Sequence, residues 1–323
     1  MCTAIGYLTD NFYFGRTLDN DVSYGEEVVV TPRRAPLVFR NLPAAERHYA
    51  FIGTACVSDG MPLYYDAVNE KGLCAAGLNF AGNAVYAPPQ AGKKNLAQFE
   101  LLPCLLGSCA SVRQAVAFLR GAHITNQAYN ADMPPAQLHW LIADRREAVV
   151  LECTREGMTI YPDPVGVLTN NPPFPMQMSR LNDFMGLSPR EPRSTFSPRM
   201  RLRSPGRGMG AYGLPGDLSS PSRFVRAAFA RENAVSGAGE AESVSQFFHM
   251  LDFVSQPRGC CAVGEKYEVT LYASCCNADT GVYYYTTYEN RTPVAVDMRR
   301  EDLESNRPAR YPFVRTMTVV RAN

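Results

Sequence analysis

Several signatures that mark common enzyme classes are missing from this 323-residue sequence. It has no H-E-x-x-H pair, no G-x-S-x-G turn and no glycine-rich phosphate loop, which argues against zinc peptidases, serine α/β-hydrolases and nucleotide-binding enzymes. Histidine is scarce, and its occurrences lie without a nearby carboxylate pattern. We therefore expect structural roles for His48, His123, His139 and His249, and we predict neither a metal site nor an organic cofactor.

The sequence also lacks an excess of charge of one sign and a long apolar run. Its 32 Lys and Arg residues against 31 Asp and Glu residues give a net charge of +1, which argues against a surface devoted to nucleic acid or anionic lipid. No stretch approaches the roughly 18 uninterrupted apolar residues of a membrane span. No charged segment followed by an apolar run opens the chain, so we predict no secretory signal and a cytoplasmic enzyme.

Ten cysteines occur, but none has the C-x-x-C spacing that is typical of zinc ribbons. The adjacent cysteines at 275 and 276 would point to opposite faces of a strand, so they cannot both face one metal ion. Without a secretory signal, a disulfide framework is not expected. We predict that most of these residues are small buried hydrophobic side chains.

One cysteine, Cys2, stands directly behind the initiator methionine. Removal of Met1 would leave a residue that carries both a free α-amine, with a pKa of about 8, and a thiol, with a pKa of about 8.5. Such a residue holds a nucleophile and a proton acceptor together, like a threonine activated by its own terminal amine. The alternative is a small residue on a buried strand.

The residues after Cys2 predict a β-hairpin. Residues 2–8 are mostly apolar, residues 9–11 (TDN) favour a turn, and residues 12–15 return as a strand. The returning strand can carry Arg16 and Asp19 back beside Cys2, where a guanidinium would favour the thiolate and a carboxylate could hold the amine. An ordinary ion pair at the end of a strand is the alternative interpretation.

Farther along, strand patterns alternate with helical ones, and no linker separates them. Helices are expected at 95–106, where Pro103 would kink or end the helix, after the capping box Ser111 to Gln114, after a Ser220 cap with Pro221 at the first position, and at 242–254. Strands are expected at 139–144, 148–153, 158–161, 166–169, 269–274 and 281–287. We predict an α+β fold: a four-layer αββα sandwich of two antiparallel sheets, in one domain covering 1–323.

Blocks along nearly the whole chain resemble one known family. They are CTAIGYLTDNFYFGRTLD (2–19), NEKGLCAAGLNFAGNAVY (69–86), LHWLIAD (138–144), GVLTNNP (166–172), YGLPGDLSSPSRFVRAAF (212–229) and YYYTTYENRTPVAVDM (283–298). In the same order, they are similar to blocks of the choloylglycine hydrolases, the bile salt hydrolases and penicillin V acylases among the N-terminal nucleophile hydrolases. The resemblance implies the same four-layer fold.

The resemblance implies roles for six residues. Cys2 would be the nucleophile, with Arg16 and Asp19 as polar neighbours; Asn79 and Asn170 would form the oxyanion hole, and Arg223 would complete the polar cluster. A preorganised amide donor can lower the barrier of amide cleavage by roughly 3 kcal/mol. Judged without the resemblance, each asparagine is equally compatible with a turn or loop.

The expected substrate is a glycine- or taurine-conjugated bile salt, which is a rigid apolar plate with an anionic tail and suits an apolar pocket ending in polar groups. Asn79 favours bile salts, because many penicillin acylases of the family have tyrosine there. Leu18, Tyr64 and Tyr65 could line an apolar wall for the acyl group, or they could simply pack in the core. Penicillin V or acyl-homoserine-lactone amide hydrolysis, and a non-catalytic binding protein, remain alternatives.

Residues 188–220 differ from the rest in composition. They are rich in Pro, Gly, Ser and Arg, and six arginines precede Gly208 against a single Glu191. In the family this place holds a long loop that embraces a neighbouring subunit, so we expect an oligomerisation loop and, by resemblance, a homotetramer. A plain solvent-exposed loop and a flexible nucleic-acid-binding segment are the other interpretations.

Overall fold

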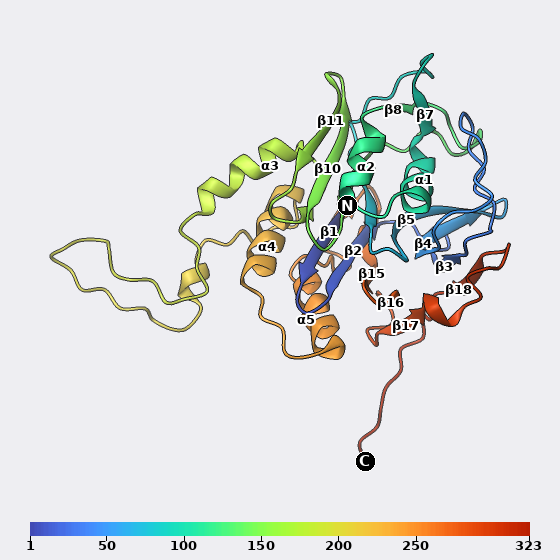
Figure 1. The fold of residues 1–323 in the computed structure, drawn as a ribbon. Helices are drawn as coiled ribbons and strands as arrows, with labels where there is room; N and C mark the ends of the chain where they lie inside the picture. Colours follow the sequence, from blue (N-terminus) through green and yellow to red (C-terminus); the bar gives the residue numbers. More distant parts are fainter.

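The structure, a computed structural model, describes residues 1–323 and contains two large sheets (Figure 1). The first sheet has the order β12 (Val167–Leu168), β1 (Cys2–Leu8), β2 (Phe12–Asn20), β15 (Val269–Asn277), β16 (Val282–Thr287) and β17 (Val294–Asp297). Every pairing in it is antiparallel. The N-terminal strand is therefore an inner strand with a hydrogen-bonded neighbour on each side.

The second sheet is also antiparallel throughout. Its order is β11 (Gly157–Pro162), β10 (Ala148–Thr154), β9 (Leu138–Ala143), β6 (Cys74–Asn79), β5 (Met61–Asn69), β4 (Phe51–Ser58), β3 (Glu27–Thr31) and β18 (Ala309–Pro312). Two small pairs lie outside the large sheets: β7 (Lys94–Ala97) beside β8 (Ala122–Thr125), and β13 (Ala262–Val263) beside β14 (Lys266–Tyr267).

Five α-helices cover the sheets: α1 (Leu101–Ser108), α2 (Val112–Leu119), α3 (Phe174–Arg180), α4 (Ser220–Asn233) and α5 (Glu240–Asp252). A buried cluster that includes Trp140 and Leu105 lies between the second sheet and the side of α1 and α2. A larger cluster joins the facing sides of the two sheets to Phe224 of α4 and Phe247 of α5. The layers are thus α, β, β and α, and the predicted four-layer fold is confirmed.

The local predictions are mostly confirmed, with most ends of elements within three residues of the predicted ones, and the returning strand continues to Asn20. The hairpin forms β1 and β2, and Ser111 caps α2 by accepting a hydrogen bond from the Gln114 backbone N–H at 3.3 Å. The predicted helix at 242–254 is α5. Apolar runs, turn residues and helix caps thus identified most of the elements.

Two local predictions are wrong. The segment 95–106 is not one helix, because residues 94–97 pair in parallel with β8 and the helix begins only at Leu101. Pro103 lies in the first turn, where its missing N–H costs no intrahelical hydrogen bond. Ser220 is not the cap of α4 but its first residue; its hydroxyl is used by Thr169 and Asn170 instead.

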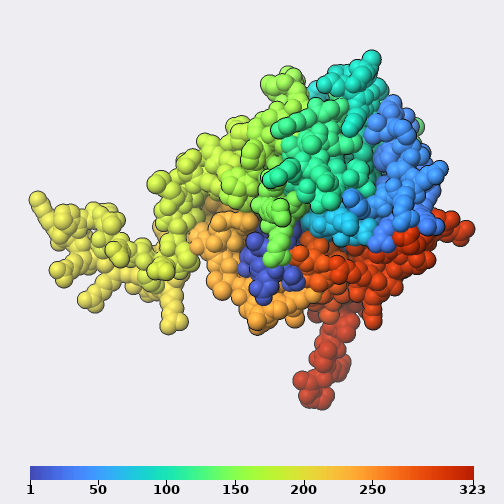
Figure 2. Space-filling view, in the orientation of Figure 1, coloured from blue at the N-terminus to red at the C-terminus, as the bar shows by residue number.

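Two segments leave the body of the molecule. The chain from 188 to 208 forms an extended arm, drawn in yellow in Figures 1 and 2. At the other end, residues 316–323 are all exposed and lead away from the sheets (Figure 1). No helix has the length and apolar character needed to cross a lipid bilayer.

Close packing of β2 against β15 depends on Gly15. A Cβ atom at Gly15 would collide with the backbone carbonyl of Ser274. Because backbone on an inner strand cannot move aside, we expect Gly15→Ala to lower the free energy of unfolding by about 2 kcal/mol. Urea unfolding followed by circular dichroism measures this change.

The control is Gly186→Ala. Gly186 has no atom near the position of a Cβ, and its φ is not in the left-handed region. We expect this change to stay within about 0.5 kcal/mol of the parent. Equal unfolding midpoints for the two variants would contradict the close approach of the strands.

Candidate active site

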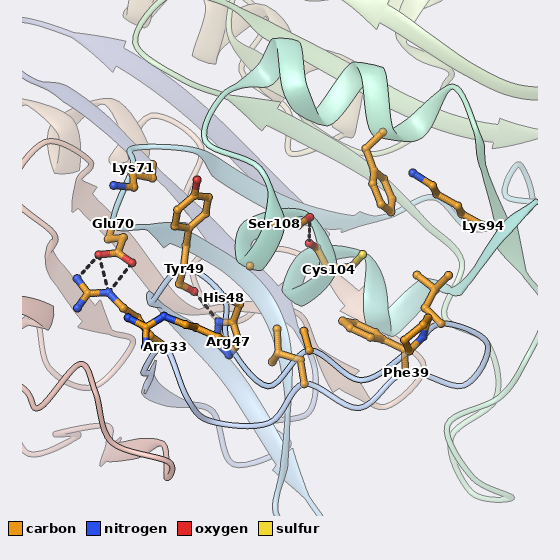
Figure 3. Close-up of a pocket in the computed structure, with 16 residues that line it drawn as sticks. Arg33, Phe39, Arg47, His48, Tyr49, Glu70, Lys71, Lys94, Cys104 and Ser108 are labelled. Atoms are coloured by element: carbon orange, nitrogen blue, oxygen red, sulfur yellow. Dashed lines mark hydrogen bonds and ion pairs between the residues drawn. The ribbon is translucent and has the colours of Figure 1, made fainter.

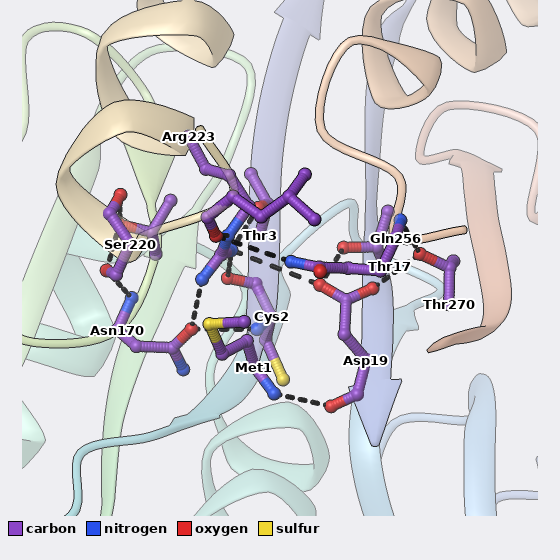
Figure 4. A network of polar contacts seen from close by, with 12 residues as sticks. Met1, Cys2, Thr3, Thr17, Asp19, Asn170, Ser220, Arg223, Gln256 and Thr270 are labelled. Atoms are coloured by element: carbon purple, nitrogen blue, oxygen red, sulfur yellow. Dashed lines mark hydrogen bonds and ion pairs between the residues drawn. The ribbon is translucent and has the colours of Figure 1, made fainter. Parts of the chain in front are cut away.

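Cys2 begins β1 and is buried, with 4% of its surface exposed. In the hairpin register it lies opposite Leu18, and its backbone N–H donates to Asn170 Oδ1 at 2.8 Å. The amino group of Met1 forms an ion pair with Glu268 and donates to the Asp19 carbonyl at 2.5 Å (Figure 4). Asn170 Oδ1 therefore already faces the backbone nitrogen of residue 2, while Asp19 and Glu268 contact the preceding amino group.

Arg223, on the first turns of α4, binds the start of the chain (Figure 4). Its Nη1 donates to the Cys2 carbonyl at 2.5 Å and to Thr3 Oγ1 at 2.7 Å, and its Nη2 donates to Asn170 Oδ1 at 2.7 Å. The planar fork of a guanidinium suits such a divided set of acceptors. Burial lowers the pKa of Arg223, although the nearby Asp19 partly offsets this effect.

The side chain of Asn170 is fixed at every polar atom. Its oxygen accepts from Cys2 and Arg223, so the amide oxygen must face these two donors, and its Nδ2 donates to the Asn79 carbonyl at 2.7 Å. The backbone N–H of Asn170 donates to Ser220 Oγ at 2.8 Å. Asn170 thus joins the end of β6 to the nitrogen of residue 2.

Asn79 ends β6, and its side chain is exposed, whereas its backbone carbonyl is the one that accepts from Asn170. The two asparagines that the sequence singled out are therefore in contact. Of the two side-chain amides, that of Asn79 is the one presented to the surface of the site.

Arg16 is fully buried on β2. Its Nη1 donates to the carbonyls of Tyr65 at 3.0 Å and Gly77 at 2.5 Å, its Nε donates to Thr17 O, and its Nη2 has no hydrogen-bond partner. Burial alone lowers the pKa of Arg16, but the nearby Cys2 thiol and other acidic groups outweigh it and raise that pKa overall. A buried guanidinium with one unused N–H group therefore lies near the thiol.

Asp19 is buried on the same strand. Its carboxylate accepts from Thr270 Oγ1 at 2.7 Å and from Thr17 Oγ1 at 3.3 Å, and it lies 4.0 Å from Arg223 Nη1. Burial raises the pKa of Asp19, and Arg223 and the terminal amino group counteract this. The structure thus brings together all six residues singled out for the polar cluster.

One buried carboxylate beside this cluster was missed by the sequence analysis. Asp66 on β5 accepts from the hydroxyls of Tyr272 and Tyr283, both at 2.6 Å, and from Ser274 Oγ at 3.2 Å. Burial raises the pKa of Asp66, while Arg16 and these hydroxyls lower it. A lone aspartate in the apolar strand Met61–Asn69 was the available signal.

A cavity of about 350 Å³ lies beside the cluster. Tyr64 and Tyr65 line it, as does Gly77, whose carbonyl accepts from Arg16, whereas Leu18 does not. Its other walls are largely apolar or aromatic and include Tyr24, Leu63, Phe99, Leu102, Tyr129, Met133, Leu138 and Trp140. Because Leu138 is the register partner of Asn79, the cavity opens next to the exposed asparagine. Its volume is within the range of small-molecule sites, about 300–1,000 Å³.

Two larger hollows lie away from Cys2. One, of about 790 Å³, is bordered by α1 and the loop from Arg33 to Tyr49 (Figure 3). The other, of about 900 Å³, lies near Arg145 and Arg231. Neither is lined by a member of the polar cluster, so size alone does not identify the site.

Other reactive side chains are dispersed. All ten cysteines are free thiols, and seven of them are buried. No group of three or more His, Cys, Asp or Glu side chains is placed to hold a metal ion. The polar cluster itself offers a thiol, two guanidinium groups and a carboxylate, which is chemistry suited to attack on a carbonyl group.

Comparison with known proteins agrees with this chemistry. Residues 2–311 match the family described as linear amide C–N hydrolases, choloylglycine hydrolase family. The chain is 50% identical over 314 residues to a bile salt hydrolase/transferase of Lactiplantibacillus plantarum, covering 97% of each chain. It is 33% identical to a bile salt hydrolase/transferase of Clostridium perfringens, over 100% of both chains.

Solved structures show the same fold. A mutant of conjugated bile acid hydrolase from Clostridium perfringens superposes with a TM-score of 0.92, at 33% identity over 100% of both chains. Penicillin V acylase from Agrobacterium tumefaciens has a TM-score of 0.76 at 21% identity, over 96% of this chain and 90% of that one. The latter similarity shows the fold alone.

The fork of Arg223 gives a stability prediction. Lysine keeps the charge but cannot reach Cys2, Thr3 and Asn170 at once, so we expect Arg223→Lys to lower the free energy of unfolding by about 3 kcal/mol. Arg226→Lys on the same helix is the matched control, because Arg226 donates only to the Pro215 and Asp217 carbonyls. Its expected loss is about 1 kcal/mol. Urea unfolding compares the two variants, and equal losses would contradict the special role of the fork.

Proposed function

Because the chain belongs to the choloylglycine hydrolase family of linear amide C–N hydrolases, we propose that it hydrolyses the amide bond of glycine- and taurine-conjugated bile salts through Cys2. The observation that carries this proposal is the arrangement at residue 2, whose nitrogen lies 2.8 Å from Asn170 and whose carbonyl is bound by Arg223. The 50% identity with a bile salt hydrolase/transferase over almost the whole chain supports the substrate class.

The first step is removal of Met1. The Cys2 nitrogen is then an α-amine, and it can accept the thiol proton, which a peptide nitrogen cannot do. Asn170 Oδ1 is already placed to accept a hydrogen bond from this amine. Asp19 contributes negative charge close by, and the buried Arg16 guanidinium contributes positive charge that acts on the thiol. A nearby guanidinium favours the thiolate over the thiol.

The thiolate then attacks the amide carbonyl carbon, and the C–N bond breaks as the nitrogen takes a proton from the Cys2 ammonium group. Glycine or taurine leaves, and the acyl group remains as a thioester on Cys2. Water attacks the thioester with the same amine as base, which frees the bile acid and restores the thiol. These steps use only the thiol, the α-amine, other groups of the chain and water.

The two asparagines have different roles in this mechanism. The Asn170 amide is committed to the Asn79 carbonyl, so we assign Asn170 the placement of the amine rather than an oxyanion hydrogen bond. The exposed Asn79 amide supplies the donor to the oxyanion, and such a donor contributes roughly 3 kcal/mol to barrier lowering. Arg223 holds both Asn170 and the chain start in place.

The cavity beside the cluster receives the acyl group. Tyr64 and Tyr65 belong to its wall, and the Tyr64 hydroxyl is paired with Thr31 Oγ1 at 2.6 Å, so the ring is held in place. Leu18 lies opposite Cys2 in the strand register and does not line this cavity. An apolar steroid body fits such walls, with its amide bond at the polar end.

The free thiols suggest where the enzyme works. None of the ten cysteines forms a disulfide bond in the structure, and two of them, Cys56 and Cys261, are only half-buried while Cys260 is exposed. Exposed thiols persist in a reducing compartment. We therefore assign the enzyme to the cytoplasm.

A substrate panel tests the proposed function. We expect kcat/KM for taurocholate and glycocholate to exceed that for penicillin V by at least about tenfold, which corresponds to ~1.4 kcal/mol of transition-state binding. Release of glycine or taurine is measured with ninhydrin. Faster hydrolysis of penicillin V than of either bile salt would contradict the assigned substrate class.

Variants at Cys2 test the mechanism. Cys2→Ala removes the nucleophile, so we expect a loss of kcat on the order of 10⁵-fold with an unchanged melting temperature. Cys2→Ser should be far slower than the parent, because a hydroxyl is much less acidic than a thiol. Intact-mass spectrometry of the active protein should give the mass of the chain without the initiator methionine. Turnover by a protein that retains Met1 would refute the role of the α-amine.

We further propose that residues 188–220 join subunits into a homo-oligomer, a tetramer by analogy with the family. All six arginines between 190 and 207 are exposed, and large apolar side chains also face outward: Phe196, Met200, Leu202 and Tyr212. The arm stands away from its own subunit (Figure 2). An extended arm with exposed apolar side chains gains buried area by packing on a second copy.

Replacing Phe196, Met200 and Leu202 together by serine should shift the assembly to smaller species, because these side chains would supply the apolar contact. Sedimentation velocity measures the size against the 35.7 kDa subunit. Val235→Ser, at a residue that is 84% exposed outside the arm, is the control and should leave the size unchanged. A parent protein that sediments as a monomer would exclude the proposed assembly.

A further inference from the structure

A buried His–Glu pair lies behind the two asparagines and has no part in the chemistry described above. His139 on β9 and Glu152 on β10 are both fully buried, and Nδ1 of the histidine lies 3.1 Å from Oε1 of the glutamate. The other ring nitrogen, Nε2, lies 2.8 Å from the Thr169 carbonyl. Leaving two polar side chains in an apolar core costs free energy unless they are well paired.

The partners of this pair fix the positions of its protons. The Thr169 carbonyl can only accept, so Nε2 of His139 carries a proton. Glu152 Oε1 also accepts from the backbone N–H of Phe174 at 2.9 Å, and its contact with Nδ1 needs a second proton between the two atoms. Glu152 Oε2 is buried without any partner. Glutamate at this position thus fixes the orientation of the ring, with Nδ1 toward Glu152 and Nε2 toward the Thr169 carbonyl.

The ring of His139 touches the segments that carry both asparagines. Thr169, whose carbonyl it binds, directly precedes Asn170. The ring also stacks on Phe80, which directly follows Asn79, with ring centroids 4.2 Å apart and planes 5° apart. Asn170 Nδ2 closes the arrangement by donating to the Asn79 carbonyl.

From this arrangement we infer that His139, oriented by Glu152, is a positioning residue that sets the placement of Asn79 relative to Asn170 during amide hydrolysis. This inference rests on the proposed function. His139 takes no part in proton transfer, because it lies beneath the reacting groups rather than among them.

His139 lies on the opposite face of β9 from the residues that line the acyl cavity, so a change at His139 is expected to affect kcat rather than substrate binding. Successive side chains of a strand point to opposite faces, so His139 points away from its neighbours Leu138 and Trp140, which line the acyl cavity. Loss of the pair should therefore displace the asparagines and leave the cavity wall in place. A misplacement of about 1 Å at a catalytic group can cost about 100-fold in rate.

Glu152→Gln is the variant of choice, because it keeps the shape but removes the carboxylate charge beside the ring. An amide oxygen at the Oε1 position would accept from Phe174 and from Nδ1 but would leave a ring with two protonated nitrogens without a neighbouring negative charge, whereas an amide nitrogen there would oppose the Phe174 N–H. We expect kcat on taurocholate to fall about 10- to 100-fold, with KM within about threefold of the parent. Phe80→Leu removes only the stacked ring and should also lower kcat, by a smaller factor than Glu152→Gln.

Asp144→Asn is the matched control. Asp144 directly follows the same strand, and its carboxylate accepts three backbone N–H groups, of Val112, Arg146 and Glu147, away from the asparagines. It should lower the melting temperature while leaving kcat within about twofold of the parent. Rates are measured well below the melting temperatures of all variants.

The possible outcomes distinguish a failure of the proposed function from a failure of the positioning role. A parent enzyme that hydrolyses no conjugated bile salt would refute the proposed function. An active parent with an unchanged kcat in folded Glu152→Gln would overturn the positioning role. A rise in KM at constant kcat would also overturn it, and if Glu152→Gln does not fold, an unchanged kcat in Phe80→Leu has the same meaning.

Discussion

The site depends on one constraint, the burial of the first strand between two neighbours. The first residues of a domain are usually loose, but here β1 pairs with β2 on one side and with β12 on the other. Arg223 then binds the carbonyl of residue 2. The nitrogen of residue 2 is thereby held by core-like contacts, and the proposed mechanism depends on this placement of the amine.

Charge in the site is arranged so that buried groups compensate one another. Taking a guanidinium or a carboxylate out of water costs several kcal/mol, and carbonyls, hydroxyls and opposite charges must offset this cost. Arg16 uses backbone carbonyls and keeps one N–H group unpaired, while Asp19 and Asp66 are surrounded by hydroxyl donors. The Arg16 guanidinium as a whole interacts electrostatically with the thiol of Cys2, the proposed nucleophile.

The sequence predicted features that depend on local pattern or on motif order. The hairpin follows from its turn residues, α2 from its capping box, and the two antiparallel sheets from strand patterns flanked by helices. The blocks around Cys2, Asn79 and Asn170 identified residues that do meet. Features that depend on distant partners were not predictable. Residues 94–97 form a strand because they pair with β8. Ser220 does not cap α4, because its hydroxyl accepts a hydrogen bond from the backbone of Asn170, 50 residues earlier in the chain. The orientation of the Asn170 amide likewise required its donors to be known.

The placement of the chain ends also decides how the protein can be handled. A purification tag ahead of residue 1 would leave the Cys2 nitrogen in a peptide bond, next to groups that already enclose Met1. The opposite end, residues 316–323, is exposed and leads away from both sheets. Affinity handles, surface-immobilisation linkers and fluorescent fusions therefore belong at the carboxyl terminus, where they leave the amino end open to methionine excision.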